Sequence, residues 1–253
     1  MMRIIYLFIS LFFGRSIPAF ADSLDIKIGQ MLMVGMPGNS VHTASPIVQD
    51  IKKGIVGGIV LFEFNLNPSN TKKNLKQLTQ DLQNAAAIPL LITIDQEGGQ
   101  VNRLKTKYGY PAMPSAKSIG NKNNDSVTHL WSATIANSLM ESGINVNYAP
   151  VLDIHHSKCP VLGKRERCFS SNPSEITKHA SILIEEHHHL GIKTTLKHFP
   201  GHGSSTSDTH LGIADVTKNW NKKELEPYKN LINEGMVDII MTAHIVNRKL
   251  DPS

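Results

Sequence analysis

A fourteen-residue stretch in the last third of the chain, residues 197–210, gathers side chains that are well suited to chemistry. It holds one lysine, three histidines and one aspartate. Asp208 and His210 stand two residues apart, so the carboxylate can accept a hydrogen bond from one ring nitrogen and leave the other nitrogen for proton transfer. This spacing predicts an orienting carboxylate beside a general acid/base.

An apolar, β-branched run must position this stretch. Residues 191–196 are typical of a buried strand, so Lys197 and His198 are expected at its carboxyl end. Pro200 and the glycines, serines and threonines after it indicate a loop. Solvation explains any single histidine here equally well. A structural loop has no use for so many titratable groups, however, so we interpret the whole string as a reaction site.

The order of these residues resembles a known family. The string Lys-His-Phe-Pro-Gly-His-Gly that begins at Lys197 is similar to a segment of the family 3 glycoside hydrolases. The string Asp-Thr-His that ends at His210 resembles the Asp-Ser/Thr-His dyad of their bacterial β-N-acetylhexosaminidase branch. The resemblance implies that His210 is the general acid/base, that Asp208 orients it, and that Lys197 and His198 bind sugar hydroxyls.

A second segment matches earlier in the chain. The string Ile-Asp-Gln-Glu-Gly-Gly-Gln-Val-Asn-Arg that ends at Arg103 resembles the family signature Ile-Asp-x-Glu-Gly-Gly-x-Val-x-Arg. The resemblance implies that Asp95 binds hydroxyls of the non-reducing sugar with support from Arg103. An ionised carboxylate at the mouth of an apolar strand is also a strong acceptor for a pair of hydroxyls. We interpret Glu97, Gly98 and Gly99 as a tight turn between a strand and a helix.

A third segment, residues 160–173, resembles the family's Gly-x-Arg-Ser-Phe-Ser-x-Asp-Pro loop, with extra residues after the glycine. We align Arg167, which precedes Cys-Phe-Ser, with the substrate-binding arginine and keep Arg165 as an alternative. Upstream, Asp153 ends a segment similar to the family's Asn-x-x-x-Ala-Pro-Val-x-Asp strand. We expect Asp153 to hold the loop or the arginine, or to cap the strand, rather than do chemistry.

The alternation of predicted elements indicates the fold. Strands are expected over residues 31–36, 55–62, 90–95, 145–154, 193–198 and 237–244, and helices over residues 45–53, 70–87, 125–142, 173–190 and 222–234. Repeated strand–helix units with polar residues at the strand ends predict an α/β fold of the (β/α)₈ TIM-barrel type. A doubly wound sheet is the alternative, but no glycine-rich phosphate fingerprint follows the first strand.

The last predicted strand resembles the family's sixth, so we expect a barrel that is incomplete at its carboxyl end. In the family the catalytic nucleophile is an aspartate after the seventh strand, and no residue of this sequence matches it. A retaining glycosidase needs that carboxylate to attack the anomeric carbon, while a second group protonates the leaving oxygen. We therefore expect no normal turnover from the 253 residues as they stand.

The amino terminus predicts export. Arg3 precedes an apolar run over residues 4–13, and Ala19-Phe20-Ala21 offers a small-x-small cleavage site, which together are typical of a secretory signal peptide at residues 1–21. The barrel domain then covers residues 22–253, and we expect a soluble protein in the periplasm or outside the cell. No other stretch approaches the ~20 apolar residues that span a membrane.

The remaining composition excludes some partners. The formal net charge is +5 with scattered lysines, so neither nucleic acid nor a membrane is an expected partner after signal cleavage. Cys159 and Cys168 could form a disulfide or remain free thiols. The histidine run 187–189 is interpreted as a solvated helix end rather than a metal site, because adjacent helical residues point in different directions. The pair at residues 155–156 is interpreted in the same way.

The resemblance implies the hydrolysis of terminal non-reducing β-N-acetylglucosamine from peptidoglycan fragments or chitooligosaccharides. Double displacement with retention and no metal or organic cofactor is expected. Three alternatives stay open: a β-glucosidase of the same family, phosphorolysis in place of hydrolysis, and a non-catalytic sugar-binding protein.

Overall fold

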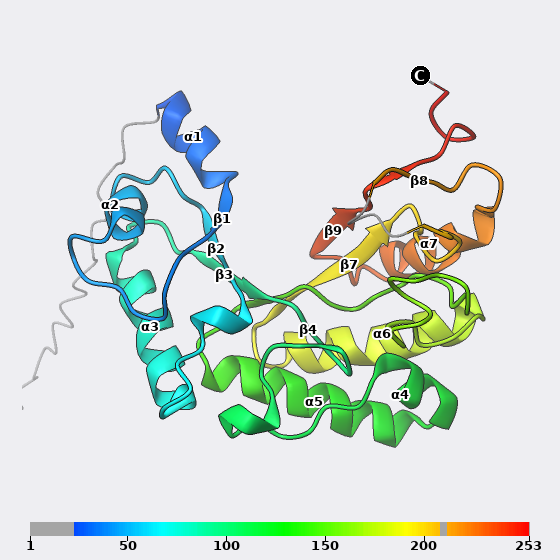
Figure 1. Ribbon diagram of the computed structural model, residues 1–253, viewed down its shortest axis with the longest axis horizontal. Helices are drawn as coiled ribbons and strands as arrows, with labels where there is room; N and C mark the ends of the chain where they lie inside the picture. The colour runs from blue at the N-terminus through cyan, green and yellow to red at the C-terminus, as the bar shows by residue number, and fades with distance from the viewer. Residues whose placement is uncertain (1–22, 208–211, 253) are drawn as a thin grey trace, which may run out of the picture.

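Parallel strands that alternate with helices make up the computed structural model, which describes residues 23–207 and 212–252 (Figure 1). Six strands form one sheet in the order β1-β2-β3-β6-β7-β9, and every pairing in it is parallel. Their bounds are β1 Met33–Gly35, β2 Gly58–Leu61, β3 Leu91–Ile94, β6 Val146–Asn147, β7 Lys193–Phe199 and β9 Ile239–Thr242. The sheet curls into a half-barrel (Figure 1), which confirms the barrel-type α/β class.

Helices connect successive strands of this sheet, and one further helix, α1, precedes the first strand. The helices are α1 Leu24–Gln30, α2 Pro46–Lys52, α3 Thr71–Ala85, α4 Ala116–Lys122, α5 Asp125–Glu141, α6 Pro173–His188 and α7 Glu226–Asn233. Neighbouring pairs pack together, with α2 on α3, α5 on α6 and α6 on α7. Such crossovers bring the carboxyl ends of all six strands to one edge of the sheet, where the βα loops begin.

Apolar side chains from the helices and strands meet in one large core. In α3, Leu75, Leu78 and Leu82 recur at helical spacing and are all buried. They join the fully buried Ile59 and Ile92 of β2 and β3. The helical periodicity therefore faces the sheet, as the pattern predicts. None of the helices in the described part of the chain is both long and apolar enough to cross a bilayer.

Among the predicted strands, the one over residues 145–154 differs most from the strand that the structure contains. Its ladder pairing in β6 covers only Val146–Asn147, and an isolated bridge joins Val151 to Lys197. Pro150 has no N–H to donate, so it interrupts the ladder, although its carbonyl accepts from Lys197. The backbone still follows β7 up to Asp153, so the strand end lies where the sequence predicts.

Several short elements lie outside the predicted pattern. Strands β4 Gln96–Gly98 and β5 Val101–Asn102 form an antiparallel hairpin, and β8 Ala214–Asp215 pairs with β10 Ile245–Val246. Three 3₁₀ turns cover Glu63–Asn65 (η1), Thr106–Tyr108 (η2) and Lys222–Leu225 (η3). The helix predicted over residues 222–234 therefore begins as a 3₁₀ turn and continues as α7.

The interpretation of the histidine run as solvated is wrong for its first member. His187 is fully buried, and its Nδ1 atom lies 2.7 Å from the Leu183 carbonyl. Burial lowers the pKa of His187 to about 4, so the imidazole is neutral at pH 7. His188 and His189 are exposed, as predicted. Cys159 and Cys168 are buried free thiols, so of the two alternatives the structure favours the free thiols.

Candidate active site

Lys197 and Asp95 meet at the carboxyl ends of two strands that are separated by β6 in the sheet. Lys197 lies in β7 and Asp95 follows β3, and the Lys197 Nζ to Asp95 Oδ1 distance is 2.8 Å. Arg103 lies 3.7 Å from the other oxygen of Asp95. The Lys197 side chain is 2% exposed and that of Asp95 is 25% exposed. The carboxylate therefore reaches solvent, while the cation that holds it does not.

Glu97 completes this network from the β4–β5 hairpin. Its Oε1 atom lies 2.7 Å from Lys197 Nζ and 2.7 Å from Arg167 Nη2, and its Oε2 atom accepts from Arg167 Nε at 2.8 Å. Burial alone would raise the pKa of Glu97, but the charges of Lys197 and Arg167 outweigh burial and lower the pKa to about 2. Glu97 is therefore ionised at any physiological pH and binds both cations in fixed positions.

His198 joins the network through Arg167 and Asp153. The Arg167 Nη2 atom lies 3.3 Å from His198 Nε2, and His198 Nδ1 lies 2.7 Å from Asp153 Oδ2. Because a guanidinium can only donate, the Nε2 atom must accept, which places the ring hydrogen on Nδ1. Burial raises the pKa of Asp153, but interactions with His198 and with the backbone of His202 lower it overall. Asp153 thus holds His198 and the loop after β7, rather than the arginine or the 160–173 loop that the sequence predicted.

Two amide side chains fix the hairpin that carries Glu97. Gln96 accepts from the backbone of Arg103 and Leu104, each at 3.0 Å, which folds β5 against β4. Asn147 of β6 donates to the Gln96 carbonyl and accepts from the Gln96 N–H, both at 3.1 Å. His187 Nε2 lies 3.0 Å from the Asn147 amide nitrogen. The backbone between Asp95 and Glu97 is therefore fixed by buried partners.

The structure brings together five of the seven residues that the sequence nominated: Asp95, Arg103, Arg167, Lys197 and His198. Asp208 and His210 lie outside the described residues, so their proposed roles stay predictions. Arg165 is exposed, and Arg167 occupies the network in its place. Within residues 23–207 and 212–252, no group of three His, Cys, Asp or Glu side chains is arranged to hold a metal ion.

Glu97 is the residue that the sequence interpretation missed. The predicted turn between a strand and a helix is instead the turn of the β4–β5 hairpin, and no helix follows it directly. The φ angles there are positive, 88° at Gly98 and 56° at Gly99. Charge balance was the available signal. Lys197 was expected at a buried strand end and Arg167 in a loop of the same site, and two buried cations require more than the single carboxylate of Asp95.

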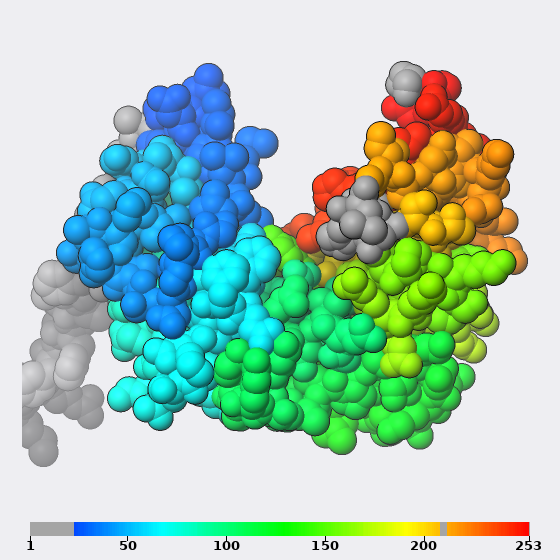
Figure 2. Space-filling view, in the orientation of Figure 1, coloured from blue at the N-terminus to red at the C-terminus, as the bar shows by residue number. Residues whose placement is uncertain are grey.

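The network lies at the strand ends, and four of its side chains reach the surface. Asp95, Arg103, Arg167 and His198 are between 13% and 27% exposed, whereas Glu97 and Lys197 are almost completely buried. Figure 2 shows that the molecule is hollowed between its N-terminal part and its C-terminal part. The exposed members offer one carboxylate and two guanidinium groups to a ligand, whereas both ring nitrogens of His198 already have partners. This set suits a neutral ligand rich in hydroxyls.

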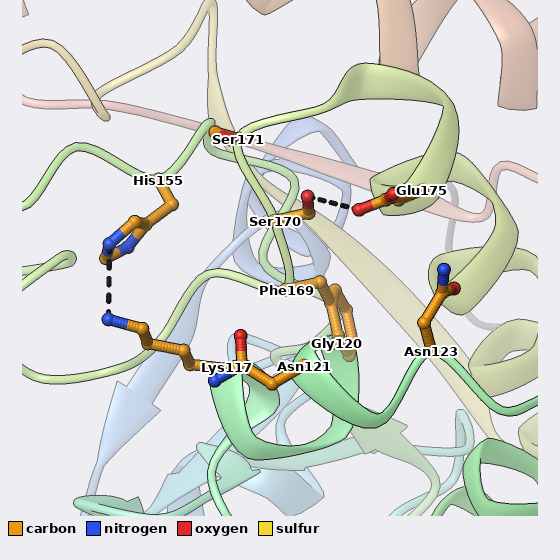
Figure 3. Close-up of a pocket in the computed structure, with 9 residues that line it drawn as sticks. All are labelled: Lys117, Gly120, Asn121, Asn123, His155, Phe169, Ser170, Ser171 and Glu175. Atoms are coloured by element: carbon orange, nitrogen blue, oxygen red, sulfur yellow. Dashed lines mark hydrogen bonds between the residues drawn. The ribbon is translucent and has the colours of Figure 1, made fainter.

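A separate cavity of about 320 Å³ lies beside the loop that carries Arg167 (Figure 3). Lys117 points toward His155 there, at 3.3 Å, and Ser170 donates to Glu175. Phe169 also lines the cavity and packs edge-on against Trp131. None of the nominated site residues lines this cavity, so it is distinct from the network at the strand ends.

Comparison with known proteins shows the family of the chain. The chain matches the family model "Glycosyl hydrolase family 3 N terminal domain" over residues 23–253. A beta-hexosaminidase of Tolumonas auensis is 36% identical over 201 residues, which cover 78% of this chain and 58% of the relative. A beta-hexosaminidase of Nitrosomonas eutropha is 32% identical over 231 residues, or 88% of this chain and 64% of the relative. The chain thus spans less than two thirds of the length of these relatives.

Solved structures share the fold. A glycoside hydrolase family 3 beta-N-acetylglucosaminidase from Paenibacillus sp. str. FPU-7 superposes with a TM-score of 0.82 at 32% identity, over 92% of this chain and 44% of that one. NagZ from Neisseria gonorrhoeae, in complex with N-trifluoroacetyl-D-glucosamine, superposes with a TM-score of 0.78 at 26% identity. The match covers 87% of this chain and 65% of that one. With its ionic network at the strand ends of a half-barrel, this chain belongs to glycosyl hydrolase family 3, of which it carries the N-terminal domain.

Proposed function

We propose that this chain forms the sugar-binding part of a β-N-acetylhexosaminidase that removes terminal non-reducing β-N-acetylglucosamine. The observation that carries the proposal is the buried ionic network of Lys197, Glu97 and Arg167, which holds Asp95 at the strand ends with its carboxylate partly exposed. A carboxylate fixed in this way is pre-organised to accept hydrogen bonds from two neighbouring ring hydroxyls. The beta-hexosaminidase names of the relatives support the same choice.

The proposed roles follow from what each group can donate or accept. Asp95 accepts from sugar hydroxyls, while Arg167 and Arg103 donate to them. The ammonium group of Lys197 donates two of its three hydrogens to Asp95 and Glu97, so at most one hydrogen remains to bind the ligand. In a retaining hydrolysis, His210 with Asp208 would protonate the leaving oxygen and later activate water. The nucleophilic carboxylate is not assigned to any described residue.

Calorimetric titration of the protein with N-acetylglucosamine and with glucose tests this proposal. We expect saturable binding of N-acetylglucosamine that is roughly 10- to 100-fold weaker in Asp95→Asn, because hydrogen bonds to a charged acceptor are lost. Asp125→Asn is the matched control, since Asp125 also pairs with a lysine, Lys178, but is 61% exposed and lies on the outer helix α5. We expect Asp125→Asn to bind as the wild type does.

A parallel assay with aryl glycosides separates the alternatives. Release of the aryl group from a β-N-acetylglucosaminide but not from a β-glucoside supports the proposal, and the reverse preference assigns the protein to the β-glucosidase branch. A rate that depends on added phosphate indicates phosphorolysis. Sugar binding with no product fits both the proposal and a non-catalytic sugar-binding protein, because no described residue is assigned as the nucleophilic carboxylate. No binding of either sugar contradicts the proposal altogether.

We also propose that the protein is exported, on the strength of Arg3, the apolar run 4–13 and Ala19-Phe20-Ala21. These residues lie outside the described part of the chain. Amino-terminal sequencing of the protein recovered from the producing cell should give Asp22 as the first residue. A protein that retains Met1 would contradict export by this route.

A further inference from the structure

The loop after β7 is held between two buried carboxyl groups, and the active-site network accounts for only one of them. Asp153 Oδ1 accepts from the backbone N–H of His202 at 2.7 Å. Glu224 Oε2, which comes from the 3₁₀ turn η3 on the other side of the loop, accepts from the N–H of Gly203 at 3.2 Å. Two consecutive N–H groups of the loop are thus bound by carboxyl groups from different parts of the chain.

The packing of this loop against Glu224 leaves no spare space. A Cβ atom added at Gly201 would lie 2.4 Å from Glu224 Oε2, and one added at Gly203 would lie 2.1 Å from the Ile154 carbonyl oxygen. The loop backbone is therefore confined between Glu224 and Ile154. A change in the size or charge of the Glu224 carboxyl group cannot be absorbed locally, so it must be transmitted to the loop.

The surroundings of Glu224 suit an uncharged carboxyl group. No described cation forms an ion pair with Glu224, which is 2% exposed. Its Oε1 atom and the Tyr228 hydroxyl are both buried without a hydrogen-bond partner among the described residues. A protonated carboxyl group has one O–H to donate, and the Tyr228 hydroxyl oxygen is a candidate acceptor. Asp153, by contrast, has His198 as a partner.

The two carboxyl groups therefore differ in protonation. Burial and the nearby charge of Asp153 raise the pKa of Glu224 to about 7, against the lowering effect of hydrogen bonds from Ser204 and Gly203. Interactions with His198 and His202 lower the pKa of Asp153. The titratable groups that face Glu224 are Asp153 and Tyr228 from α7, and the charge of His202 acts on Asp153. Environments that separate two carboxyl pKa values assign the proton to one of them.

We propose that Glu224 is a positioning residue whose protonated form fixes the loop from Gly201 to Ser205 and, through this loop and Asp153, the imidazole of His198 in the sugar site. Ionisation of Glu224 places a second buried negative charge beside Asp153 and removes the only proton that Glu224 can donate. The anchorage of the loop therefore weakens as the pH rises through neutrality. The consequence for sugar affinity rests on the function proposed above, whereas the titration of the loop does not.

Trp220 supplies a readout that needs no sugar. Its indole N–H donates to the carbonyl of Pro200, at the start of the loop, at 3.0 Å. In a variant with Trp131 replaced by phenylalanine, we expect the fluorescence of Trp220 to titrate with a midpoint near pH 7. Glu224→Gln, which keeps an uncharged acceptor for Gly203, should abolish this titration. Glu226→Gln is the matched control, because Glu226 is an exposed glutamate two residues away in the chain.

Two further measurements complete the test. Carbon-13 NMR of glutamate carboxyl groups in the wild-type protein should show one resonance that titrates near pH 7 and disappears in Glu224→Gln. N-acetylglucosamine affinity should fall roughly tenfold between about pH 6 and pH 8.5 in the wild type and in Glu226→Gln, but stay constant in Glu224→Gln.

The proposal is overturned if every glutamate carboxyl group titrates below pH 5.5, or if Glu224→Gln keeps the Trp220 titration. It is also overturned if Glu224→Gln retains the alkaline loss of affinity that the wild type shows. If the sugar does not bind at any pH, the proposed function fails, and the fluorescence and NMR titrations still decide the role of Glu224.

Discussion

The carboxylate of Glu97 has two cations as direct partners, Lys197 and Arg167, and almost no contact with solvent. Desolvating such a group costs several kcal/mol, and only the two ion pairs offset this cost. Asp95 forms an ion pair with the same lysine. The loss of any one charged side chain of this network therefore leaves at least one of the remaining charges without its partner. The site is therefore held by charge balance among residues that are far apart in the sequence.

Glu97→Gln tests this balance. The amide keeps the size of the side chain but removes its charge, so we expect a loss of roughly 3–5 kcal/mol in the free energy of unfolding. Glu63→Gln is the matched control, because Glu63 also lies between two lysines, Lys105 and Lys107, but is 30% exposed. There we expect a loss of about 1 kcal/mol or less, since exposed ion pairs contribute little. Equal losses in urea denaturation would contradict the argument.

His187 predicts how stability depends on pH. Its pKa of about 4 in the folded protein is below the ordinary value of 6.5, so the unfolded chain takes up the proton first. The contribution of the neutral, buried imidazole to the free energy of unfolding is fully present above pH 6.5. It is lost as the pH falls toward 4, and the loss is on the order of 3 kcal/mol.

The measurement is the free energy of unfolding at several pH values for the wild type, His187→Gln and His189→Gln. The acid-side loss should be smaller in His187→Gln by the contribution of this imidazole. His189 is 73% exposed, so His189→Gln should follow the wild type. An unchanged acid-side slope in His187→Gln would show that the buried imidazole does not control this loss.

At the scale of elements, the pattern of apolar residues was sufficient to predict the strands of the main sheet. All six predicted strands occur in the predicted order, because largely buried parallel strands have apolar runs such as that of β3, in which all residues but Leu91 are buried. The β4–β5 hairpin could not be predicted in this way. Its five strand residues include Gln96, Glu97 and Asn102, whose burial depends on partners elsewhere in the fold rather than on an apolar pattern.

The bounds of β6 and the presence of α4 also depend on features other than an apolar pattern. Pro150 breaks the ladder of the predicted strand, although the chain keeps its direction beside β7. Helix α4 has only seven residues, and its position depends on tertiary contact with the loop that carries Arg167. Lys117 N–H donates to the Glu166 carbonyl, for example. Short elements that are fixed by distant partners leave no periodic signal in the sequence.

Gly120 in α4 tests that contact. Replacing a helical glycine by alanine normally stabilises a helix by up to about 1 kcal/mol. Here the added Cβ would lie 1.9 Å from the Phe169 carbonyl oxygen, two residues after Arg167. We therefore expect Gly120→Ala to destabilise the protein by about 1–3 kcal/mol in thermal unfolding, because the loop must move. The exposed Lys122→Ala in the same helix should change stability very little, and a stabilising Gly120→Ala would contradict the contact.

At the scale of the whole molecule, the ionic network joins two inner strands of the sheet, β3 and β7, across β6. The pair Lys197–Asp95 joins residues 102 positions apart, and the pair Arg167–Glu97 joins residues 70 positions apart. The strand β6 lies between β3 and β7 and pairs with both. Because the core also runs continuously from α3 to α7, no boundary separates an N-terminal from a C-terminal half.

This continuity predicts cooperative unfolding, and the two tryptophans of the chain can report on it separately. Trp131 in α5 packs against Phe169 in the core, whereas Trp220 binds the loop after β7 through Pro200. In urea, the single-tryptophan variants Trp220→Phe and Trp131→Phe should each show one fluorescence transition that coincides with the loss of circular dichroism in the same variant. An earlier Trp220 transition would mean that the loop and its Glu224 anchor open before the sheet does. In that case the loop would be a separate unit of stability, and its pH dependence would move the Trp220 transition but not the Trp131 transition.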